Sequence, residues 1–340
     1  MILGLLAILL VVLILPFASK KVEHHLEFFL FIMGVFAVLL TRQWTIHLAL
    51  EALYEPIPIT IAVGIFGLVF KWTRKLLDRS VQWTIQKISI RLFTVFLIFI
   101  LGLASSIITA IIAALILVEV ISMLRLSRKE EINIVIIACF SIGIGAALTP
   151  VGEPLSTILI AKLREWPHVD FWYIFHLAGA EIIAAVFAVS VLSFFFHSPS
   201  REEGLESKTR EENYAQILLR TGKIYLFVMA LVFLGQGFKP LIDTYIIHLP
   251  GDLLYWINMI SAVLDNATVT AAEISPAMSE IQIKKILMGL LISGGMLIPG
   301  NIPNIIATSK LKIKSKEWAR LGVPLGFVLM LIFFFILKME

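Results

Sequence analysis

Long apolar runs, separated by short polar segments, dominate the hydrophobic pattern of the chain. They lie near residues 1–19, 26–41, 57–70, 92–124, 132–163, 172–196, 222–238, 252–278, 282–309 and 320–337. A helical bilayer crossing needs about 20 apolar residues, so the pattern predicts an all-α polytopic membrane protein. The first run contains no Lys or Arg and is followed by Lys20 and Lys21. We therefore expect a retained first span with its N-terminus outside, not a cleaved signal peptide.

Two of these runs do not fit a single crossing. Run 92–124 has 33 residues, which is too long for one span and too short for two. Run 252–278 is similar. Each run has polar side chains in its middle, where contact with lipid is costly: Ser105, Ser106 and Thr109 in the first, and Asp265, Asn266 and Thr268 in the second. We predict that each run forms a re-entrant helical hairpin with these side chains at its tip.

The distribution of positive charge supports the two hairpins, because cytoplasmic loops collect Lys and Arg. If both hairpins return to the side that they entered, 21 of the 28 Lys and Arg fall inside and 7 outside. If both runs cross fully, the division is 16 to 12. The count predicts about eight full spans and two hairpins, with both termini outside.

Two stretches rich in Gly and Pro resemble each other at an offset of 149 residues. Residues 145–154 read Gly-Ala-Ala-Leu-Thr-Pro-Val-Gly-Glu-Pro, and residues 294–303 read Gly-Gly-Met-Leu-Ile-Pro-Gly-Asn-Ile-Pro. Each stretch interrupts an apolar run and follows a predicted hairpin, so we expect two inverted repeats. The predicted units are a first span and loop (1–25), repeat one (26–196, hairpin 92–124, broken helix 132–163), a cytoplasmic linker (197–221) and repeat two (222–340, hairpin 252–278, broken helix 282–309).

Proline geometry explains what these stretches do to a helix. A proline inside a helix removes an N–H and clashes with the carbonyl one turn earlier, whereas the first turn tolerates it. Unwound carbonyls and the positive end of the next half-helix then face the same place. The two loops contribute the candidate ion-binding residues Thr149, Pro150, Gly152, Glu153, Asn301 and Asn304. The alternatives are a pair of structural kinks and, for Glu153, a helix cap.

Polar-tipped hairpins followed by helices with Gly- and Pro-rich breaks resemble the ion transporter superfamily. It includes arsenite permeases, divalent-anion/sodium symporters, citrate transporters and NhaD-type sodium/proton antiporters. Residues 148–153 and 261–268 look most similar to the NhaD-type antiporters and to a small group of uncharacterised predicted cation transporters. The resemblance covers residues 90–340 and implies a homodimer in the cell (inner) membrane, with elevator or rocking alternating access. Ser105 and Ser106 stand where the symporters carry Ser-Asn-Thr, which disfavours a carboxylate-type anion.

The two halves place their acids differently. Repeat one has a neutral tip and Glu153 in its loop, whereas repeat two has Asp265 at its tip and a neutral loop. No Lys or Arg lies within either predicted site, which favours a cation. We predict a Na⁺/H⁺ antiporter that holds Na⁺ with Asp265, Asn266 and Glu153, while protons compete for the carboxylates. Because half-helix N-termini also attract anions, the alternative is a sodium-coupled symporter of a small anion.

Other acidic residues have two interpretations each. Glu181 lies in the middle of a run, where it is a candidate proton relay or the partner in an interhelical hydrogen bond. Glu119 and Glu273 lie nearer to the ends of their runs, where we expect interfacial solvation.

Composition narrows the remaining classes of protein. Only 15% of the residues are charged, against about a quarter in soluble domains, so no sizeable soluble domain fits. The basic residues lie between apolar runs, as topology requires, and not on a nucleic-acid-binding face. A single cysteine, Cys139, excludes disulfides and Cys-based metal sites. The chain lacks Walker, His-Glu-x-x-His and Gly-x-Ser-x-Gly motifs, so we expect neither an enzyme nor a cofactor. A receptor-like bundle and a channel remain as further classes.

Overall fold

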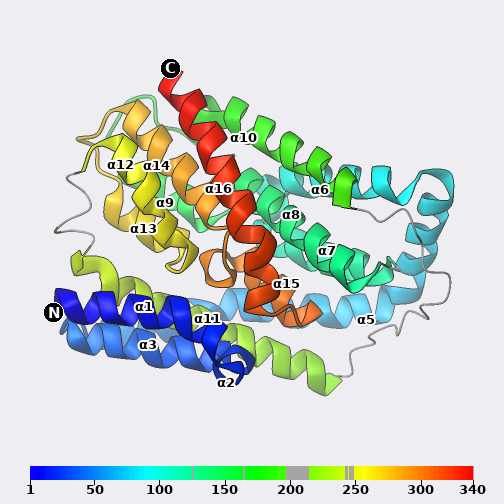
Figure 1. Cartoon of the computed structure of the whole chain (residues 1–340), viewed down its shortest axis with the longest axis horizontal. Helices are drawn as coiled ribbons and strands as arrows, with labels where there is room; N and C mark the ends of the chain where they lie inside the picture. The colour runs from blue at the N-terminus through cyan, green and yellow to red at the C-terminus, as the bar shows by residue number, and fades with distance from the viewer. Residues whose placement is uncertain (125, 164, 197–213, 242–243, 245–248, 340) are drawn as a thin grey trace.

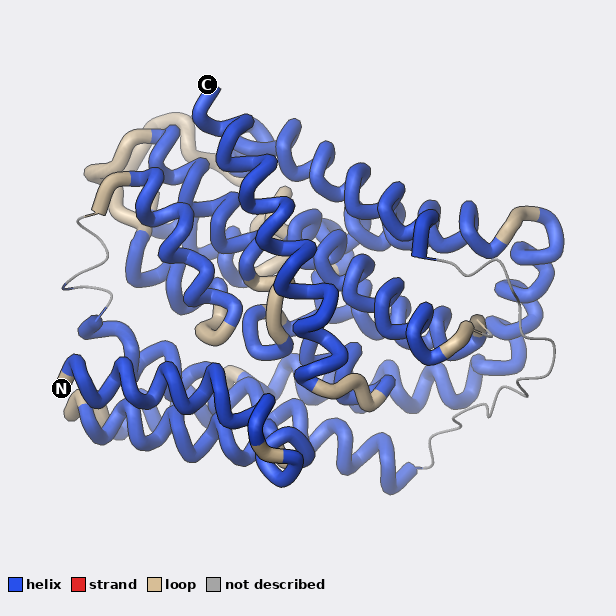
Figure 2. Tube along the Cα trace, viewed as in Figure 1, coloured by secondary structure: helices blue, strands red, loops and turns tan. Residues whose placement is uncertain are grey.

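The structure, a computed structural model, describes residues 1–339 except 125, 164, 197–213, 242–243 and 245–248. The side chains of residues 70, 74–78, 80–82, 85–86, 268 and 272 also lie outside the described part. Regular structure among the described residues is helical throughout, with no strand (Figure 2). The predicted all-α class is confirmed.

One layer of the molecule consists of long helices that pack side by side. Its members are α1 (Ile2–Ala18), α3 (Leu26–Leu40), α5 (Pro56–Lys87) and α11 (Tyr214–Leu241), with the short helices α2 (Lys20–His24) and α4 (Ile46–Tyr54) (Figure 1). Glycines let α3 and α11 approach closely. A Cβ at Gly34 would lie 2.8 Å from the Cβ of Phe233, and one at Gly237 would lie 2.5 Å from the Cβ of Ala37. Helix α11 also packs against α5.

The other layer contains the two hairpins and the two broken helices. Its α-helices are α6 (Ile90–Ile108), α7 (Ala110–Met123), α8 (Arg128–Ala146), α9 (Pro154–Lys162), α10 (Tyr173–Leu192), α12 (Gly251–Ile257), α13 (Asn266–Glu273), α14 (Glu280–Ser293), α15 (Ile302–Leu311) and α16 (Ser315–Met339). The 3₁₀ helices are η1 (Ser193–Phe196), η3 (Asn258–Ala262) and η4 (Ile298–Gly300). Residues 134–146 of α8 and 286–293 of α14 are all buried. Helices that are apolar all round take such positions.

Both buried helices begin with the same local signal. Ser127 caps α8 in a capping box with Glu130, and Ser279 caps α14 in a capping box with Gln282. In this arrangement the side chains of the two residues satisfy each other's free backbone N–H groups. The helices therefore start a few residues before their apolar runs, in polar sequence.

Several helices are suited to a membrane. Among the described residues, five helical segments are long and apolar enough to cross one: Ile46–Thr73, Ile90–Ile108, Tyr173–Phe196, Tyr214–Leu241 and Ser315–Met339. Helices α1, α3 and α7 are apolar but shorter. The chain is thus a helical protein with membrane-spanning character, while the expected eight full spans and the inverted relation of the halves stay predictions.

The two hairpin runs each contain a break between two helical arms. Run 92–124 breaks at Thr109, between α6 and α7, and these arms pack against each other. Run 252–278 breaks at 263–265, between α12 with η3 and α13. Helix α6 is by itself long and apolar enough to cross a membrane, a property that its interpretation as a hairpin arm did not anticipate.

The boundary after the first half differs from the expected one. Helix α11 begins at Tyr214, inside the segment 197–221 that the sequence assigns to a linker. Residues 197–213 of that segment lie outside the described residues.

Candidate functional site

The first helix break lies between α8 and α9. Helix α8 ends at Ala146, and α9 begins at Pro154, where a proline sacrifices no helical hydrogen bond. The Ser156 hydroxyl donates to the carbonyl of Ala147 at 3.0 Å and closes the loop. Pro150 lies in the loop itself. The second half-helix thus begins at the expected proline, whereas the first ends at Ala146, before Pro150.

The tip of the α6–α7 hairpin docks onto this loop. The N–H of Ala110 donates to the Gly152 carbonyl at 2.9 Å, and the Thr149 hydroxyl donates to the Ser106 carbonyl at 2.5 Å. Gly152 permits this approach, because a Cβ there would lie 2.8 Å from the Cα of Ser106. Ser105 is fully buried, with its hydroxyl 3.0 Å from the Ile142 carbonyl of α8.

Thr109 holds an unusual backbone conformation at this tip. Its φ of 75° and ψ of 149° are rarely adopted by residues with a side chain. The Thr109 hydroxyl accepts the N–H of Ile112 at 3.4 Å and caps α7. Strained backbone of this kind gathers at functional sites.

The second helix break is residues 294–301, between α14 and α15. The Asn304 amide donates to the carbonyls of Gly294 and Leu297, both at 2.9 Å, and so holds the loop. Gly300 lies against the second hairpin, because a Cβ at this position would be 3.0 Å from the Cα of Ala262. Pro299 lies within η4, in the middle of the break.

The second hairpin tip also docks onto its loop. The Ser261 hydroxyl lies 2.6 Å from that of Ser293, at the end of α14. Asp265 is partly buried, and its Oδ2 accepts the N–H of Ala267 at 3.1 Å. The Asn266 side chain is 1% exposed and lies against Gly294, where a Cβ would be 2.4 Å from its Nδ2.

Corresponding positions in the two breaks carry different side chains. Glu153 directly precedes α9 with φ and ψ of −149° and 143°, and Asn301 directly precedes α15 with −154° and 146°. On the hairpins, Thr109 and Asp265 each accept an N–H from the first turn of the following helix. Each acid thus has a neutral counterpart. Glu153 and Asn301 are 148 residues apart, so the alignment at 149 is one residue out of register at this position.

The two acids of the site interact across the halves. Glu153 lies within electrostatic range of Asp265, although one belongs to a helix break and the other to a hairpin tip. Glu55, at the junction of α4 and α5, lies within range of Asp265 as well. Three carboxyl groups that act on one region attract a cation.

Glu55 was not singled out by the sequence reasoning. A signal for it exists, because Glu55 directly precedes Pro56 in an apolar stretch, as Glu153 directly precedes Pro154.

Three buried oxygens at the two breaks have no hydrogen-bond partner among the described residues. They are Glu153 Oε2, Asn266 Oδ1 and Asn304 Oδ1. Buried polar atoms are nearly always hydrogen-bonded, so these oxygens are available to a bound cation. Glu153 occupies the N-cap position of α9, but its side chain makes no cap hydrogen bond. The structure therefore does not support a capping role for the carboxylate.

The remaining predicted residues lie in different surroundings. Asn301 is 4% exposed and packs on Gly143 of α8, where a Cβ would be 2.3 Å from its Nδ2. The side chain of Thr268 lies outside the described residues. Glu181 forms an ion pair with Lys284 at 2.7 Å, which links α10 to α14.

The expected interfacial solvation of Glu119 and Glu273 is wrong. Glu119 is 5% exposed and forms an ion pair with Lys310 at 2.8 Å, between α7 and α15. Glu273 is completely buried. Packing of each hairpin on a half-helix from the other half of the chain removes both side chains from the surface.

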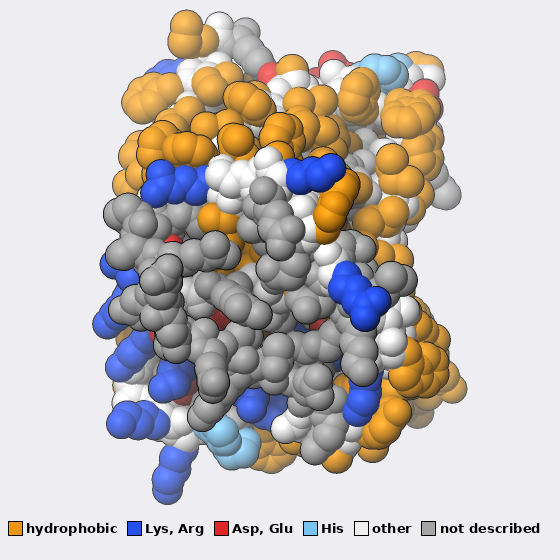
Figure 3. All heavy atoms as spheres, turned by 90° about the vertical axis from the view of Figure 1, so that its right-hand side faces the viewer, with side chains coloured by type: hydrophobic (Ala, Val, Ile, Leu, Met, Phe, Trp, Pro, Cys, Tyr) orange, Lys and Arg blue, Asp and Glu red, His pale blue; other side chains and the backbone are white. Residues whose placement is uncertain are grey.

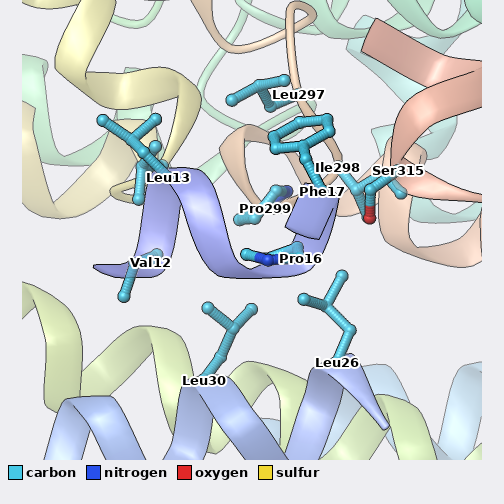
Figure 4. Close-up of a pocket in the computed structure, with 11 residues that line it drawn as sticks. Val12, Leu13, Pro16, Phe17, Leu26, Leu30, Leu297, Ile298, Pro299 and Ser315 are labelled. Atoms are coloured by element: carbon cyan, nitrogen blue, oxygen red, sulfur yellow. The ribbon is translucent and has the colours of Figure 1, made fainter. Parts of the chain in front are cut away.

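An apolar pocket lies beside the second break (Figure 4). Side chains of α1 and α3 face Leu297, Ile298 and Pro299 across it, and Val263 of the hairpin tip also lines it. The pocket thus separates the layer of long helices from the loop next to the candidate site.

Comparison with known proteins gives a family for the chain. No curated protein matches the sequence. One family, described as a protein of unknown function (DUF1646), matches residues 2–339. Because this match covers nearly the whole chain, the protein belongs to the DUF1646 family.

Proposed function

We propose that this protein is a secondary active transporter that exchanges Na⁺ for H⁺. The observation that carries the proposal is that Glu153 lies within electrostatic range of Asp265, in a region that also holds the unpartnered buried oxygens of Asn266 and Asn304. Carboxylate and amide oxygens bind hard cations, and a carboxylate can hold either a cation or a proton. Such backbone breaks persist at membrane depth only where they are buried or line a cavity.

Contacts at the ends of the broken helices support an inverted arrangement of the two halves. At one end, Arg128 at the start of α8 donates to the carbonyl of Leu311 at the end of α15, at 2.8 Å. At the other end, Trp166, after α9, donates to the carbonyl of Pro276 at 3.3 Å. Each broken helix thus starts near the end of the other. Antiparallel broken helices are what inverted repeats produce.

A cation suits the charges better than an anion does. The lysines Lys284 and Lys310 reach into the helical layer, but they pair with Glu181 and Glu119. The competing interpretation, a sodium-coupled anion symporter, draws on the N-termini of α9 and α15 at the two breaks, since helix N-termini bind anions. It stays as the alternative outcome of the experiment below.

The positions of basic residues support the proposed membrane orientation. Figure 3 views the molecule from the right-hand side of Figure 1 and shows Lys and Arg side chains on that end. The positive-inside rule assigns such an end to the cytoplasm. Both chain termini lie toward the opposite side in Figure 1, as the proposed topology requires.

Alternating access needs two bodies that can move relative to each other. The layer of α1, α3, α5 and α11 is the candidate scaffold, and the layer with the hairpins and broken helices is the candidate moving part. Apolar side chains line the pocket between α1, α3 and the second break (Figure 4). An apolar boundary has few directional contacts to break, which favours elevator or rocking motion along it.

The exchange cycle then uses the carboxyl pair as a shared site. Facing one side, ionised Glu153 and Asp265 bind Na⁺ together with the Asn266 amide oxygen. Facing the other, protons replace Na⁺ and neutralise the pair. Two ionised, unpaired carboxylates in a dry interior are costly, so the empty, unprotonated site does not cross.

A sodium jump on proteoliposomes tests the proposal. Native protein is reconstituted with a pH dye inside, and Na⁺ is added outside with an impermeant anion. We expect the lumen to become alkaline, because Na⁺ enters as H⁺ leaves. Asp265→Asn, which keeps the side-chain volume but holds no exchangeable proton, should abolish the response, whereas Asn266→Ala should raise the Na⁺ concentration that it needs. Sodium-dependent uptake of a labelled carboxylate or oxyanion, without the pH response, would establish the symporter instead.

A further inference from the structure

Glu273 is a buried carboxyl group for which the proposed exchange site has no use. It ends α13, is 0% exposed, and neither of its oxygens has a hydrogen-bond partner among the described residues. Asn258 is its polar neighbour, but no hydrogen bond of normal geometry joins the two side chains. The Asn258 amide nitrogen instead donates to the Ile286 carbonyl at 3.4 Å, and its Oδ1 is also unpartnered.

The first hairpin has a carboxyl group in the corresponding place, and it is paired. Glu119 lies on the second arm of that hairpin, α7, which packs on α15. Lys310, near the end of α15, forms a buried ion pair with it at 2.8 Å. Glu273 lies on the second arm of the other hairpin, α13, which packs on α9 in the same way.

Helix α9 also has a lysine at the matching position, but it turns away. Lys310 is eight residues past the first residue of α15, Ile302, and Lys162 is eight residues past the first residue of α9, Pro154. Lys162 is exposed, whereas Glu273 is completely buried. The two hairpin interfaces therefore differ in charge. The first holds a carboxylate with a counter-charge, whereas the second holds a carboxyl group that has none among the described residues.

Other charged groups on the elements around α13 are engaged elsewhere or exposed. The η3 segment carries none. On α14, three charged residues form ion pairs: Lys284 with Glu181, Lys285 with Asp252, and Glu280 with His168. On α11, Lys223 forms an ion pair with Glu27, Arg220 lies against Gly67 of α5, and Lys239 is exposed.

We propose that Glu273 is a proton-binding site, separate from the Glu153–Asp265 pair, that gains and loses one proton as the α13–α9 interface closes and opens. In the closed interface seen here, an ionised carboxylate would be fully buried with no counter-charge among the described residues, so the group is held in its protonated form. Opening of the interface admits water to the carboxyl group and lets the proton leave. Glu119 differs from it in having the ammonium group of Lys310 beside it, at 2.8 Å.

The assignment rests on the proposed function only in naming Na⁺ as the ion to which this proton is coupled. Proton binding itself needs no Na⁺ and can be measured in its absence. Infrared difference spectra of the purified full chain, recorded between acidic and alkaline pH without Na⁺, report the carbonyl band of protonated carboxyl groups. We expect Glu273→Gln to lack one carboxyl contribution to this difference, and the matched variant Glu119→Gln to retain it. The glutamine in Glu273→Gln imitates the protonated acid, so the variant should fold.

Two results of the infrared measurement would overturn the assignment. One is a difference spectrum of Glu273→Gln that equals that of the native protein. The other is a Glu273 band that is present at every pH, which makes the residue a permanently protonated structural acid.

A second measurement connects this proton to transport. In the sodium-jump assay, Glu273→Gln should lower sodium-driven proton flux at least tenfold, while sodium binding to the purified variant stays within about twofold of native. Native-like flux in this variant would contradict a role for Glu273 in the cycle. If the native protein itself shows no sodium-driven flux, the proposed exchange fails, and the infrared spectra still decide whether Glu273 exchanges a proton.

Discussion

Glu153 and Asn301 occupy the same backbone position in the two helix breaks, one residue before α9 and α15, with φ and ψ that agree within 5°. One position therefore carries a charge in the first half and a neutral amide in the second. The Glu153 side chain makes no cap hydrogen bond and its Oε2 is unpartnered. The charge of Glu153 is therefore not required for the local fold, and we expect this charge to bind the transported cation.

Glu153→Gln is expected to separate function from folding. The amide makes this position resemble Asn301 and removes half of the charge of the Glu153–Asp265 pair. Sodium affinity at alkaline pH should fall at least tenfold, about 1.4 kcal/mol, while the melting temperature stays within about 2 °C of native. Calorimetric titration and thermal unfolding of the same preparation measure both. Unchanged affinity would return Glu153 to a structural role.

Gly152, in the first break, and Gly222, in α11, allow the same Gly→Ala substitution to be compared at a crowded and an open position. A Cβ at Gly152 would lie 2.0 Å from the Ala146 carbonyl oxygen at the end of α8 and 2.8 Å from the Cα of Ser106 at the hairpin tip, so Gly152→Ala must displace the loop from both. We expect it to destabilise the protein by about 1–3 kcal/mol and to weaken sodium binding. At Gly222, in α11, a Cβ would meet nothing within 4 Å. Gly222→Ala should stabilise the protein by about 0.4–1 kcal/mol through the unfolded chain.

Denaturant unfolding in one detergent compares these two variants. Equal stabilities would contradict the close docking of the tip on the loop.

The two buried glutamates on the hairpins should respond differently to the same substitution. Glu119→Gln removes the carboxylate of a buried ion pair with Lys310, which costs about 3–5 kcal/mol. Replacing both members, as in Glu119→Gln with Lys310→Met, should recover most of this loss. Glu273→Gln replaces a neutral acid by an amide of similar size and should cost less than about 1 kcal/mol. A loss on Glu273→Gln as large as that on Glu119→Gln would mean that Glu273 is ionised and paired.

Membrane orientation is testable by labelling single cysteines in a Cys139→Ser background. Lys129→Cys and Lys314→Cys change exposed residues at the start of α8 and in the neighbouring α15–α16 turn, so both should react with an impermeant reagent from the cytoplasmic side. Glu165→Cys and Ala277→Cys change exposed residues near the opposite ends of the broken helices. They should react only from outside. Labelling of all four from one side would rule out the proposed topology.

Local chemistry made the helix breaks predictable. Pro154 constrains its own backbone, Gly152 leaves space for close approach, and polar residues in an apolar run mark the hairpin tips. The sequence did not predict which residues of the two breaks correspond. The prolines of the two breaks align at an offset of 149 residues, whereas the first residues of α9 and α15 align at an offset of 148. The contacts of Gly152 and Gly300 with the hairpin tips support the latter register, and such contacts are made across long stretches of sequence.

Burial of the other acids was not predictable for the same reason. Glu119 and Glu273 lie near the ends of apolar runs, a position typical of solvated residues. They are buried because α7 packs on α15 and α13 packs on α9, pairings between different halves of the chain. Glu55 was not predicted because its electrostatic proximity to Asp265 depends on where the α4–α5 junction lies in space, which the sequence does not show.

The central claim, that Na⁺ and H⁺ compete for the Glu153–Asp265 pair, is tested most directly by the protons released when Na⁺ binds. Sodium is titrated calorimetrically into the native protein near neutral pH, in two buffers that differ in heat of ionisation. Because a cation displaces protons from the ligands that they share, we predict that the measured heat differs between the buffers by close to one ionisation heat per Na⁺ bound. We also predict that sodium affinity falls about tenfold for each pH unit of acidification in the range where the pair takes up that proton. Sodium binding with the same heat in both buffers and no dependence on pH would contradict the claim.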